Sequence, residues 1–240
     1  MSVEPSAPRA ILFDVGDTLL EERRFDLATG IHAAVRDRDR AAALSEEFRA
    51  EVIVQHLHHR EPLLARWLRN RVPSLQTQSV TEIEDVVWEA IVTLVPRPGV
   101  HQALGLVETD DLPLAAVSNA AFSGRVLMSE LARHGLALPL RFVVSSAYTG
   151  VRKPAAAIFV AALARLQMPA SSTWFVGDTW NEDIVGARAA GLQPVWFGGN
   201  EAEAGSVPVV RDWDAFMRHY SAARTRARPQ ANEYTDTEKE

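Results

Sequence analysis

The stretch "ILFDVGDTLL", residues 11–20, indicates both a fold and the place of a candidate site. Three apolar residues lead into Asp14, and a second carboxylate, Asp17, follows three positions later with Gly16 between the two. A short apolar run of this kind is typical of a strand buried in a parallel sheet, and ligands bind beyond the carboxyl ends of such strands. Asp14 is therefore predicted to lie where a buried strand meets a ligand.

Further short apolar runs have the same character. With the first, the predicted strands are residues 10–14, 113–119, 141–146, 173–178, 194–198 and 207–210. From Val100 onward these runs alternate with helical patterns, of which the clearest cover residues 123–135, 155–167 and 181–191. Alternation of strands and helices predicts an α/β fold, a doubly wound parallel sheet with right-handed crossovers.

Almost a hundred residues separate the first two predicted strands, which is too many for one crossover. Within this intervening segment the apolar residues recur at spacings of three and four, so residues 22–95 are expected to form helices without strands. The predicted organisation therefore has three parts. Residues 1–21 plus 96–221 form a core domain, residues 22–95 form an inserted helical cap domain, and residues 222–240 form a disordered polar tail.

Composition excludes several classes of function. The chain has 240 residues, 47% of them hydrophobic, and a formal net charge of −6, so nucleic acid is not an expected partner. It contains no cysteine, and therefore no disulfide or thiolate zinc site, which fits a reducing cytoplasm. The opening "MSVEPSAPRA" lacks the apolar segment of a signal peptide, and no 18-residue apolar run predicts a membrane span. A cytoplasmic protein is expected.

Lysine is unusually rare in this chain. Of 25 basic residues only Lys153 and Lys239 are lysines, and the second lies in the predicted tail. Chance would explain a single lysine in the body of the protein as well as function would. Its position in "VRKP", directly after the third predicted strand, makes it a candidate for a site.

Polar side chains follow the predicted strands at their carboxyl ends. The set consists of Asp14, Asp17, Thr18, Ser118, Asn119, Lys153, Asp178 and Asp183. Taken singly, most of these residue types commonly cap helices, but together they would converge on one crevice. Clustered carboxylates repel one another unless a cation joins them, and Mg²⁺ prefers such oxygen ligands. A carboxylate can also attack phosphorus, while a hydroxyl, a backbone N–H and a lysine suit the phosphoryl oxygens.

Four motifs carry a resemblance to a known family. They are "FDVGDTLL", "AVSNA", "VRKP" and "FVGDTWNEDIVGA", in this order. Through these four motifs the chain resembles the haloacid dehalogenase superfamily, and within it the branch that has a helical cap and a Rossmann-like core. The resemblance covers about residues 9–215.

The resemblance implies a role for each matching position. Asp14 would be the nucleophile, and the Mg²⁺ site would consist of Asp14, Asp178, the backbone carbonyl of Gly16 and Asp183, which would hold metal-bound water. Ser118, Asn119 and Lys153 would hold the phosphoryl group of a small phosphate ester, and Thr18 would support the first loop.

The first motif departs from the family pattern at one position. Phosphatases of this family usually read Asp-x-Asp-Gly-Thr, in which the second Asp acts as general acid and base. Here Gly16 takes that position and Asp17 takes the usual position of the glycine. Asp17 is therefore expected to be a loop residue rather than a displaced acid, the alternative role. In the expected case the loop lacks a general acid and base, a group typically worth about 10²–10⁴-fold in rate.

The predicted cap offers further polar side chains. His56, His58, His59, Arg60, Arg66 and Arg69 could meet an anionic substrate or lie on solvated helix faces. Arg23 and Arg24, just after the first loop, are closer candidates. Trp67 and Trp88 are expected in the core of the cap.

The expected function is a Mg²⁺-dependent phosphatase that forms a phospho-Asp14 intermediate. Two alternatives remain open at this stage. A haloacid dehalogenase would use Asp14 on carbon and would remain active after removal of metal. A binding protein of the same family, weakened by the missing acid, would be inert towards phosphorylated metabolites.

Overall fold

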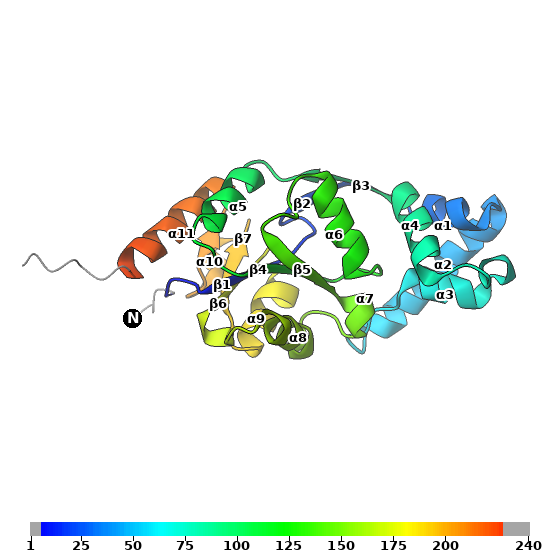
Figure 1. The fold of residues 1–240 in the computed structure, drawn as a ribbon. Helices are drawn as coiled ribbons and strands as arrows, with labels where there is room; N and C mark the ends of the chain where they lie inside the picture. Colours follow the sequence, from blue (N-terminus) through cyan, green and yellow to red (C-terminus); the bar gives the residue numbers. More distant parts are fainter. Residues whose placement is uncertain (1–5, 228–240) are drawn as a thin grey trace, which may run out of the picture.

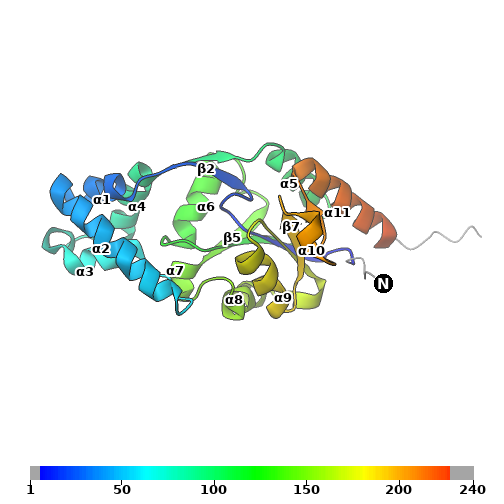
Figure 2. The same ribbon diagram turned by 180° about the vertical axis from the view of Figure 1, so that it is seen from behind.

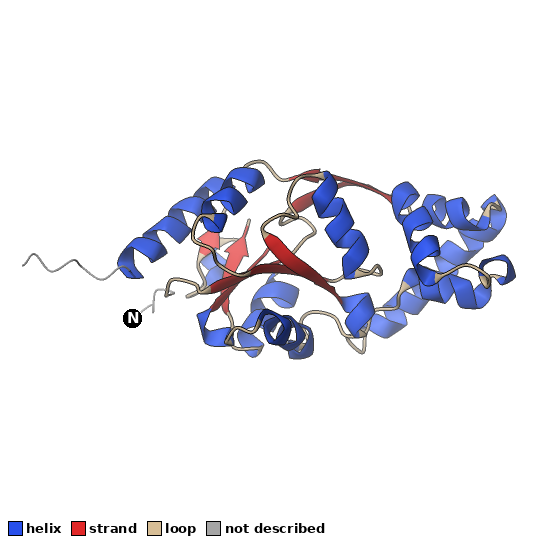
Figure 3. Ribbon diagram, viewed as in Figure 1, coloured by secondary structure: helices blue, strands red, loops and turns tan. Residues whose placement is uncertain are grey.

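The computed structural model describes residues 6–227, and a six-stranded parallel sheet lies at its centre (Figures 1 and 3). Its strands run in the order β5-β4-β1-β6-β7-β8. They are β1 (Ala10–Phe13), β4 (Leu114–Ser118), β5 (Leu140–Ser145), β6 (Thr173–Gly177), β7 (Gln193–Phe197) and β8 (Val209–Val210). Every pairing is parallel, and all six strands lie within or next to the predicted runs. The predicted α/β fold is confirmed.

Helices cover both faces of the sheet, because the strands are apolar on both. In β1, Ile11 and Phe13 pack into the core formed with α5 (Val100–Glu108), α6 (Gly124–Arg133) and α11 (Trp213–Ala227). The alternate residues Ala10 and Leu12 pack against α8 (Ala156–Leu166) and α9 (Gly186–Ala189) on the opposite face. Figure 1 shows the first three helices above the sheet and the other two below it. A strand buried on both sides explains the uninterrupted apolar sequence that precedes Asp14.

The order of the strands places a topological switch point beside Asp14. From β1 the chain winds outward through β4 and β5, then returns to the other side of β1 as β6. Leu12 of β1 therefore pairs in register with Phe175 of β6. In open α/β sheets ligands bind at the carboxyl ends of the two strands that flank such a reversal. The residues that follow β1 and β6 are Asp14 and Asp178.

Four helices form a separate group at one end of the molecule, which we call the helical unit (Figure 2). They are α1 (Leu27–Val35), α2 (Arg38–His56), α3 (Leu64–Arg71) and α4 (Val80–Ile91). Buried Ile31, Leu44 and Val87 belong to their apolar core. Side chains of Asp26 and Asp37 cap the first two helices, and Ser79 forms a capping box with Glu82 on the last. These caps satisfy N–H groups that a helix start leaves free.

The prediction of helices alone for residues 22–95 is wrong at both ends of this segment. Strand β2 (Leu20–Phe25) and strand β3 (Val92–Pro96) pair in antiparallel fashion and form what we call the β2–β3 ribbon. The apolar spacing of α4 continues to Val95, but Val92, Thr93 and Val95 are β-branched and favour a strand when a partner is available. That partner is β2, which is distant in sequence.

The predicted tail begins too early. Helix α11 continues through Ala227, and Ala223 is buried at 1% exposure against the core, so residues 222–227 are helical. The remainder of that prediction, residues 228–240, lies outside the described residues. Shorter elements complete the fold: α7 (Ser146–Thr149), α10 (Glu201–Ala204), a π-helical turn (Trp180–Val185) and 3₁₀ turns (Pro73–Leu75 and Ala170–Ser172). Within residues 6–227, every helix is too short or too polar to cross a membrane.

Candidate active site

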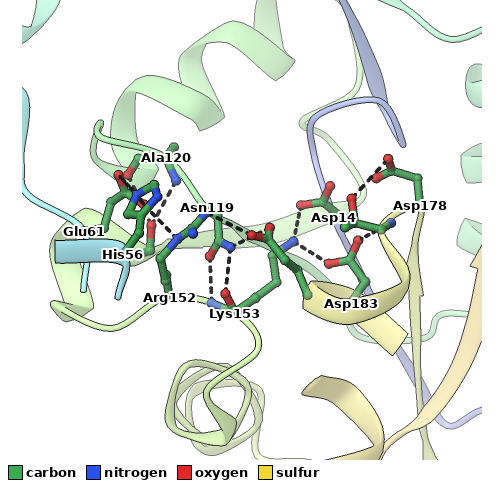
Figure 4. A network of polar contacts seen from close by, with 12 residues as sticks. Asp14, His56, Glu61, Asn119, Ala120, Arg152, Lys153, Asp178 and Asp183 are labelled. Atoms are coloured by element: carbon green, nitrogen blue, oxygen red, sulfur yellow. Dashed lines mark hydrogen bonds and ion pairs between the residues drawn. The ribbon is translucent and has the colours of Figure 1, made fainter. Parts of the chain in front are cut away.

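Three carboxylates meet at the switch point, and we call them the carboxylate cluster (Figure 4). Asp14 follows β1, Asp178 follows β6, and Asp183 lies on the π-helical turn. One oxygen from each lies within 4.8 Å of the others. Asp14 and Asp183 are 7% and 1% exposed, so two of the three carboxylates are almost removed from water. The structure thus brings together the three acids that were predicted as metal ligands.

Asp183 is fixed by its own turn. Its carboxylate Oδ2 accepts a hydrogen bond from the Thr179 N–H at 2.9 Å, and its own N–H donates to the Thr179 carbonyl at 2.8 Å. Gly177 lies against this carboxylate, because a Cβ at position 177 would stand only 2.5 Å from the Asp183 Cγ. Glycine is required there for close approach rather than for a left-handed backbone. π-Helical turns are frequent at functional sites, and this one aims Asp183 at the cluster.

Asp178 is tied to the first loop. The hydroxyl of Thr18, which is fully buried, donates to Asp178 Oδ1 at 3.2 Å. The indole N–H of Trp196 donates to the Asp178 carbonyl at 2.7 Å. Thr18 therefore connects the residues after β1 with those after β6, and its supporting role in the reaction stays a prediction.

Lys153 lies between two members of the cluster. Its Nζ donates to Asp14 Oδ1 at 2.5 Å and to Asp183 Oδ1 at 2.6 Å, and the residue is only 2% exposed. Asn119 holds the backbone of Lys153 at both ends: its Oδ1 accepts from the Lys153 N–H at 2.8 Å, and its Nδ2 donates to the Lys153 carbonyl at 3.0 Å. The only lysine of residues 6–227 is thus an internal counter-ion, not a surface residue.

The electrostatics of the site are dominated by burial. Burial raises the pKa of Asp14 to about 8, with Asp183 and Asp178 adding to the rise and Lys153 opposing it. Burial and the charge of Asp183 also raise the pKa of Asp178. Burial alone would lower the pKa of Lys153, but the charges of Asp14 and Asp183 outweigh it and raise that pKa. Three acids facing one ammonium leave negative charge that a further cation would balance.

Ser118 and Gly16 face a neighbouring cavity of about 360 Å³, which we call the Gly16 cavity. Ser118 ends β4 and is 6% exposed, and Asn119 lines the cavity beside it. The opposite walls come from the helical unit and the β2–β3 ribbon. The predicted metal contact through the Gly16 carbonyl and the phosphoryl contacts of Ser118 and Asn119 remain predictions.

Asp17 lies outside the carboxylate cluster, in an exposed turn. Its backbone has a φ of 51°, the left-handed region that favours glycine, and its N–H donates to the Leu20 carbonyl at 2.7 Å. The backbone differs between these two residues in the same order. Asp17, which takes the usual position of the glycine, adopts the left-handed conformation, and Gly16 does not.

Among the side chains of the predicted cap that were singled out in the sequence, His56 reaches the Gly16 cavity. Its Nε2 is 3.0 Å from Glu61 Oε2. The others are exposed and do not line that cavity: His58, His59, Arg60, Arg66 and Arg69. Arg23 and Arg24, the closer candidates for substrate contact, lie exposed on β2 and pair with Glu21 and Asp26. Trp67 and Trp88 are buried, as expected for core residues.

Sequence reasoning missed three charged residues that connect the helical unit to the site. The Nε of Arg152 is 3.2 Å from Glu61 of the helical unit's α2–α3 loop, and its Nη2 is 3.0 Å from Glu182. Glu182 in turn accepts a hydrogen bond from the Nδ2 of Asn119 at 2.8 Å. Figure 4 shows this chain of contacts running from His56 to the carboxylate cluster. Arg152 and Glu182 stand inside the recognised motifs, beside Lys153 and Asp183, but nothing in the sequence pairs them with Glu61.

Comparison with known proteins assigns the chain to a family. Residues 8–191 match the family described as haloacid dehalogenase-like hydrolase. The ribulose-1,5-bisphosphate 5-phosphatase of Halopiger xanaduensis is 31% identical over 145 residues, a match that spans 60% of each chain. The glyceraldehyde 3-phosphate phosphatase of Methanopyrus kandleri is 30% identical over 198 residues, 78% of this chain and 82% of that protein.

Among solved structures, the 2-haloacid dehalogenase of Pseudomonas syringae shares the fold with a TM-score of 0.62. It is 23% identical, over 89% of this chain and 98% of its own. At that identity the likeness concerns the fold alone. The family match covers most of the chain and all four motifs that form the site, so this chain belongs to the haloacid dehalogenase-like hydrolases.

Proposed function

We propose that the protein is a Mg²⁺-dependent phosphatase that hydrolyses a small phosphate monoester through a phospho-Asp14 intermediate. The observation that carries the proposal is the carboxylate cluster, held by one buried lysine beside Ser118 at the switch point. The two curated relatives are named as phosphatases of small phosphorylated sugars, which supports the same reaction class.

The donor set fits Mg²⁺. The cluster offers oxygen atoms only, and three acids with one ammonium leave an excess of two negative charges when all are ionised. Asp14, Asp178 and Asp183 would hold the ion. Hard dications prefer such ligands, and a bound Mg²⁺ would neutralise charge on the phosphoryl oxygens.

The chain's own residues then account for the transfer. One carboxylate oxygen of Asp14 attacks phosphorus, the bond from phosphorus to the ester oxygen breaks, and the leaving group departs with the electron pair. The Ser118 hydroxyl, the Asn119 N–H and Lys153 donate to the phosphoryl oxygens and hold them for in-line attack. Water next attacks the phosphorus of the aspartyl phosphate, which releases phosphate and restores Asp14.

Release of phosphate from a panel of phosphorylated metabolites, including ribulose 1,5-bisphosphate and glyceraldehyde 3-phosphate, tests the proposal. We expect turnover in Mg²⁺ and its loss in EDTA. Cleavage of 2-haloacids that persists in EDTA would instead indicate the dehalogenase. The presence of both Asp178 and Asp183 in the cluster favours the phosphatase, because a metal-free reaction need not keep both acids. An inert, Mg²⁺-replete protein would indicate a binding function.

Replacing Asp178 and Asp183 together by Asn should weaken Mg²⁺ binding by about 100-fold or more, because neutral amides do not balance a hard dication. Calorimetric titration with Mg²⁺ measures this directly. Asp85→Asn is a matched control, because this aspartate is exposed and pairs with Arg125 far from the cluster. If the double variant binds Mg²⁺ as the native protein does, the ion lies elsewhere.

Gly16→Asp should raise turnover of alkyl phosphates by about tenfold or more, because it supplies the missing general acid. The structure tolerates the change: a Cβ at position 16 meets nothing within 4 Å, and the backbone there is not left-handed. The measurement is the ratio of alkyl to aryl phosphate turnover in both proteins. An unchanged ratio in the folded variant would show that the proton comes from another group, with His56 the first to test.

Asp17→Gly is the control for this experiment. It places glycine where the left-handed backbone favours it and leaves position 16 without an acid. We expect its ratio of alkyl to aryl turnover to match that of the native protein, which separates the effect of the acid from any change in the loop.

A further inference from the structure

The Gly16 cavity is lined mainly by carbon. Aromatic side chains reach it from three directions: Phe25 from the β2–β3 ribbon, Phe48 and Trp88 from the helical unit, and Phe122 from the loop after β4. The rings of Trp88 and Phe122 pack edge to face, with their centroids 4.8 Å apart, and form part of the apolar wall of the cavity. Further aliphatic lining comes from Val15, Leu27, Val52, Leu64, Val92, Leu94 and Leu127. An apolar, flat group would fill such a space.

Four polar side chains of the cavity already have partners: His56, Glu61, Asn119 and Arg152. His56 and Arg152 both contact Glu61, and Arg152 also contacts Glu182. Asn119 is engaged with the backbone of Lys153. Glu22, Arg49 and Ser118 also line the cavity, but the aromatic and aliphatic side chains outnumber them. A ligand with several hydroxyls, such as a sugar, would find few partners there, which opposes its binding.

The missing acid points to the same kind of ligand. Gly16 lines this cavity and presents no carboxyl to protonate a departing oxygen. A phenol ionises with a pKa of about 10, whereas an aliphatic alcohol resembles water, whose pKa is about 16. A phenolate therefore leaves without help from an acid, and an alkoxide does not.

From these two independent features we propose that the protein acts on aryl phosphate monoesters, with the aromatic ring seated in the Gly16 cavity. The inference rests on the proposed phosphatase activity and names its substrate class. The bond from phosphorus to the phenolic oxygen breaks as Asp14 attacks, and the phenolate departs with the electron pair and takes its proton from water. Phosphate and a phenol are the products after hydrolysis of the aspartyl phosphate.

Three monoesters separate the two features: phenyl phosphate, benzyl phosphate and glycerol phosphate, each assayed with Mg²⁺ by phosphate release. Phenyl and benzyl phosphate share the ring but differ in the leaving oxygen, whereas benzyl and glycerol phosphate both release an alkoxide but differ in polarity. We expect kcat/KM to fall by about tenfold or more at each step, from phenyl to benzyl to glycerol. Glycerol phosphate turned over as well as benzyl phosphate, or benzyl as well as phenyl, would overturn the inference. Hydrolysis of none of the three, together with turnover of another member of the metabolite panel, would overturn this inference alone, whereas no turnover of any monoester would refute the phosphatase itself.

A cavity variant gives a second readout. Phe25 is 47% exposed, so Phe25→Ala should fold, and it should lower kcat/KM for phenyl phosphate by about tenfold more than kcat/KM for glycerol phosphate. Tyr148→Ala is the matched control: that ring is 79% exposed and does not line the cavity. Equal losses on both substrates in Phe25→Ala would overturn the placement of the ring.

Discussion

Asp14→Asn should reduce turnover by about 10⁴-fold or more, because an amide is a poor nucleophile and a poor ligand for a hard cation. The structure adds an expectation about stability. Burial raises the pKa of Asp14 to about 8, so the folded protein already disfavours its charged form. A neutral, isosteric amide relieves that desolvation and can still accept from Lys153, so the metal-free variant should melt no lower than the native protein.

Phosphate release and thermal unfolding of the metal-free protein measure both effects. Asp17→Asn serves as the control, because it changes a neighbouring exposed carboxylate that lies outside the cluster. Turnover of Asp14→Asn within about threefold of the native value would remove Asp14 from the chemistry. A large loss of stability would instead assign it a structural role.

Lys153→Arg should lower kcat/KM by about 100-fold even though the charge is kept. The Nζ of Lys153 is 2.5 and 2.6 Å from two carboxylates, and the residue is only 2% exposed. The centroid of the Phe175 ring lies 5.6 Å from the same Nζ. A planar guanidinium is wider than an ammonium and has to displace Asp14 or Asp183. Small displacements at a reacting centre cost about this much in rate.

Lys153→Met separates position from charge. It leaves Asp14 and Asp183 without their common partner and should destabilise the metal-free protein by about 3–5 kcal/mol, the usual cost of breaking a buried ion pair from one side. Denaturant unfolding in EDTA measures this loss, and added Mg²⁺ should restore part of it. Normal turnover in Lys153→Arg would mean that the position of this lysine in an arginine-rich chain is incidental.

The sheet and most of the site were predictable because their signals are local. A strand buried on both faces is apolar throughout, as in Ile11 to Phe13. The residue that follows such a strand lies at the carboxyl end of the sheet. The convergence of Asp14, Asp178 and Asp183 follows from the order of strands in a doubly wound sheet.

The remainder depends on partners that are distant in sequence. Val92 to Pro96 is a strand only because β2 lies beside it, and the helical spacing of α4 conceals this. The contact of Arg152 with Glu61 joins a loop of the core to a loop of the helical unit. Neither residue forms part of a periodic pattern, so no local signal could pair them. The apolar lining of the Gly16 cavity is also dispersed over several elements, and on sequence alone it reads as ordinary core.

The β2–β3 ribbon has a mechanical consequence. Both chain connections between the helical unit and the large sheet run through this pair of strands, which are hydrogen-bonded to each other. Because the two strands are paired, one connection cannot move without the other. We therefore expect the helical unit to rotate as one body on a hinge formed by the ribbon. On the far side of the Gly16 cavity, the Arg152 N–H donates to the His59 carbonyl at 2.9 Å, and its guanidinium contacts Glu61. We expect such a rotation to widen the Gly16 cavity and to break the contacts of Arg152 with His59 and Glu61.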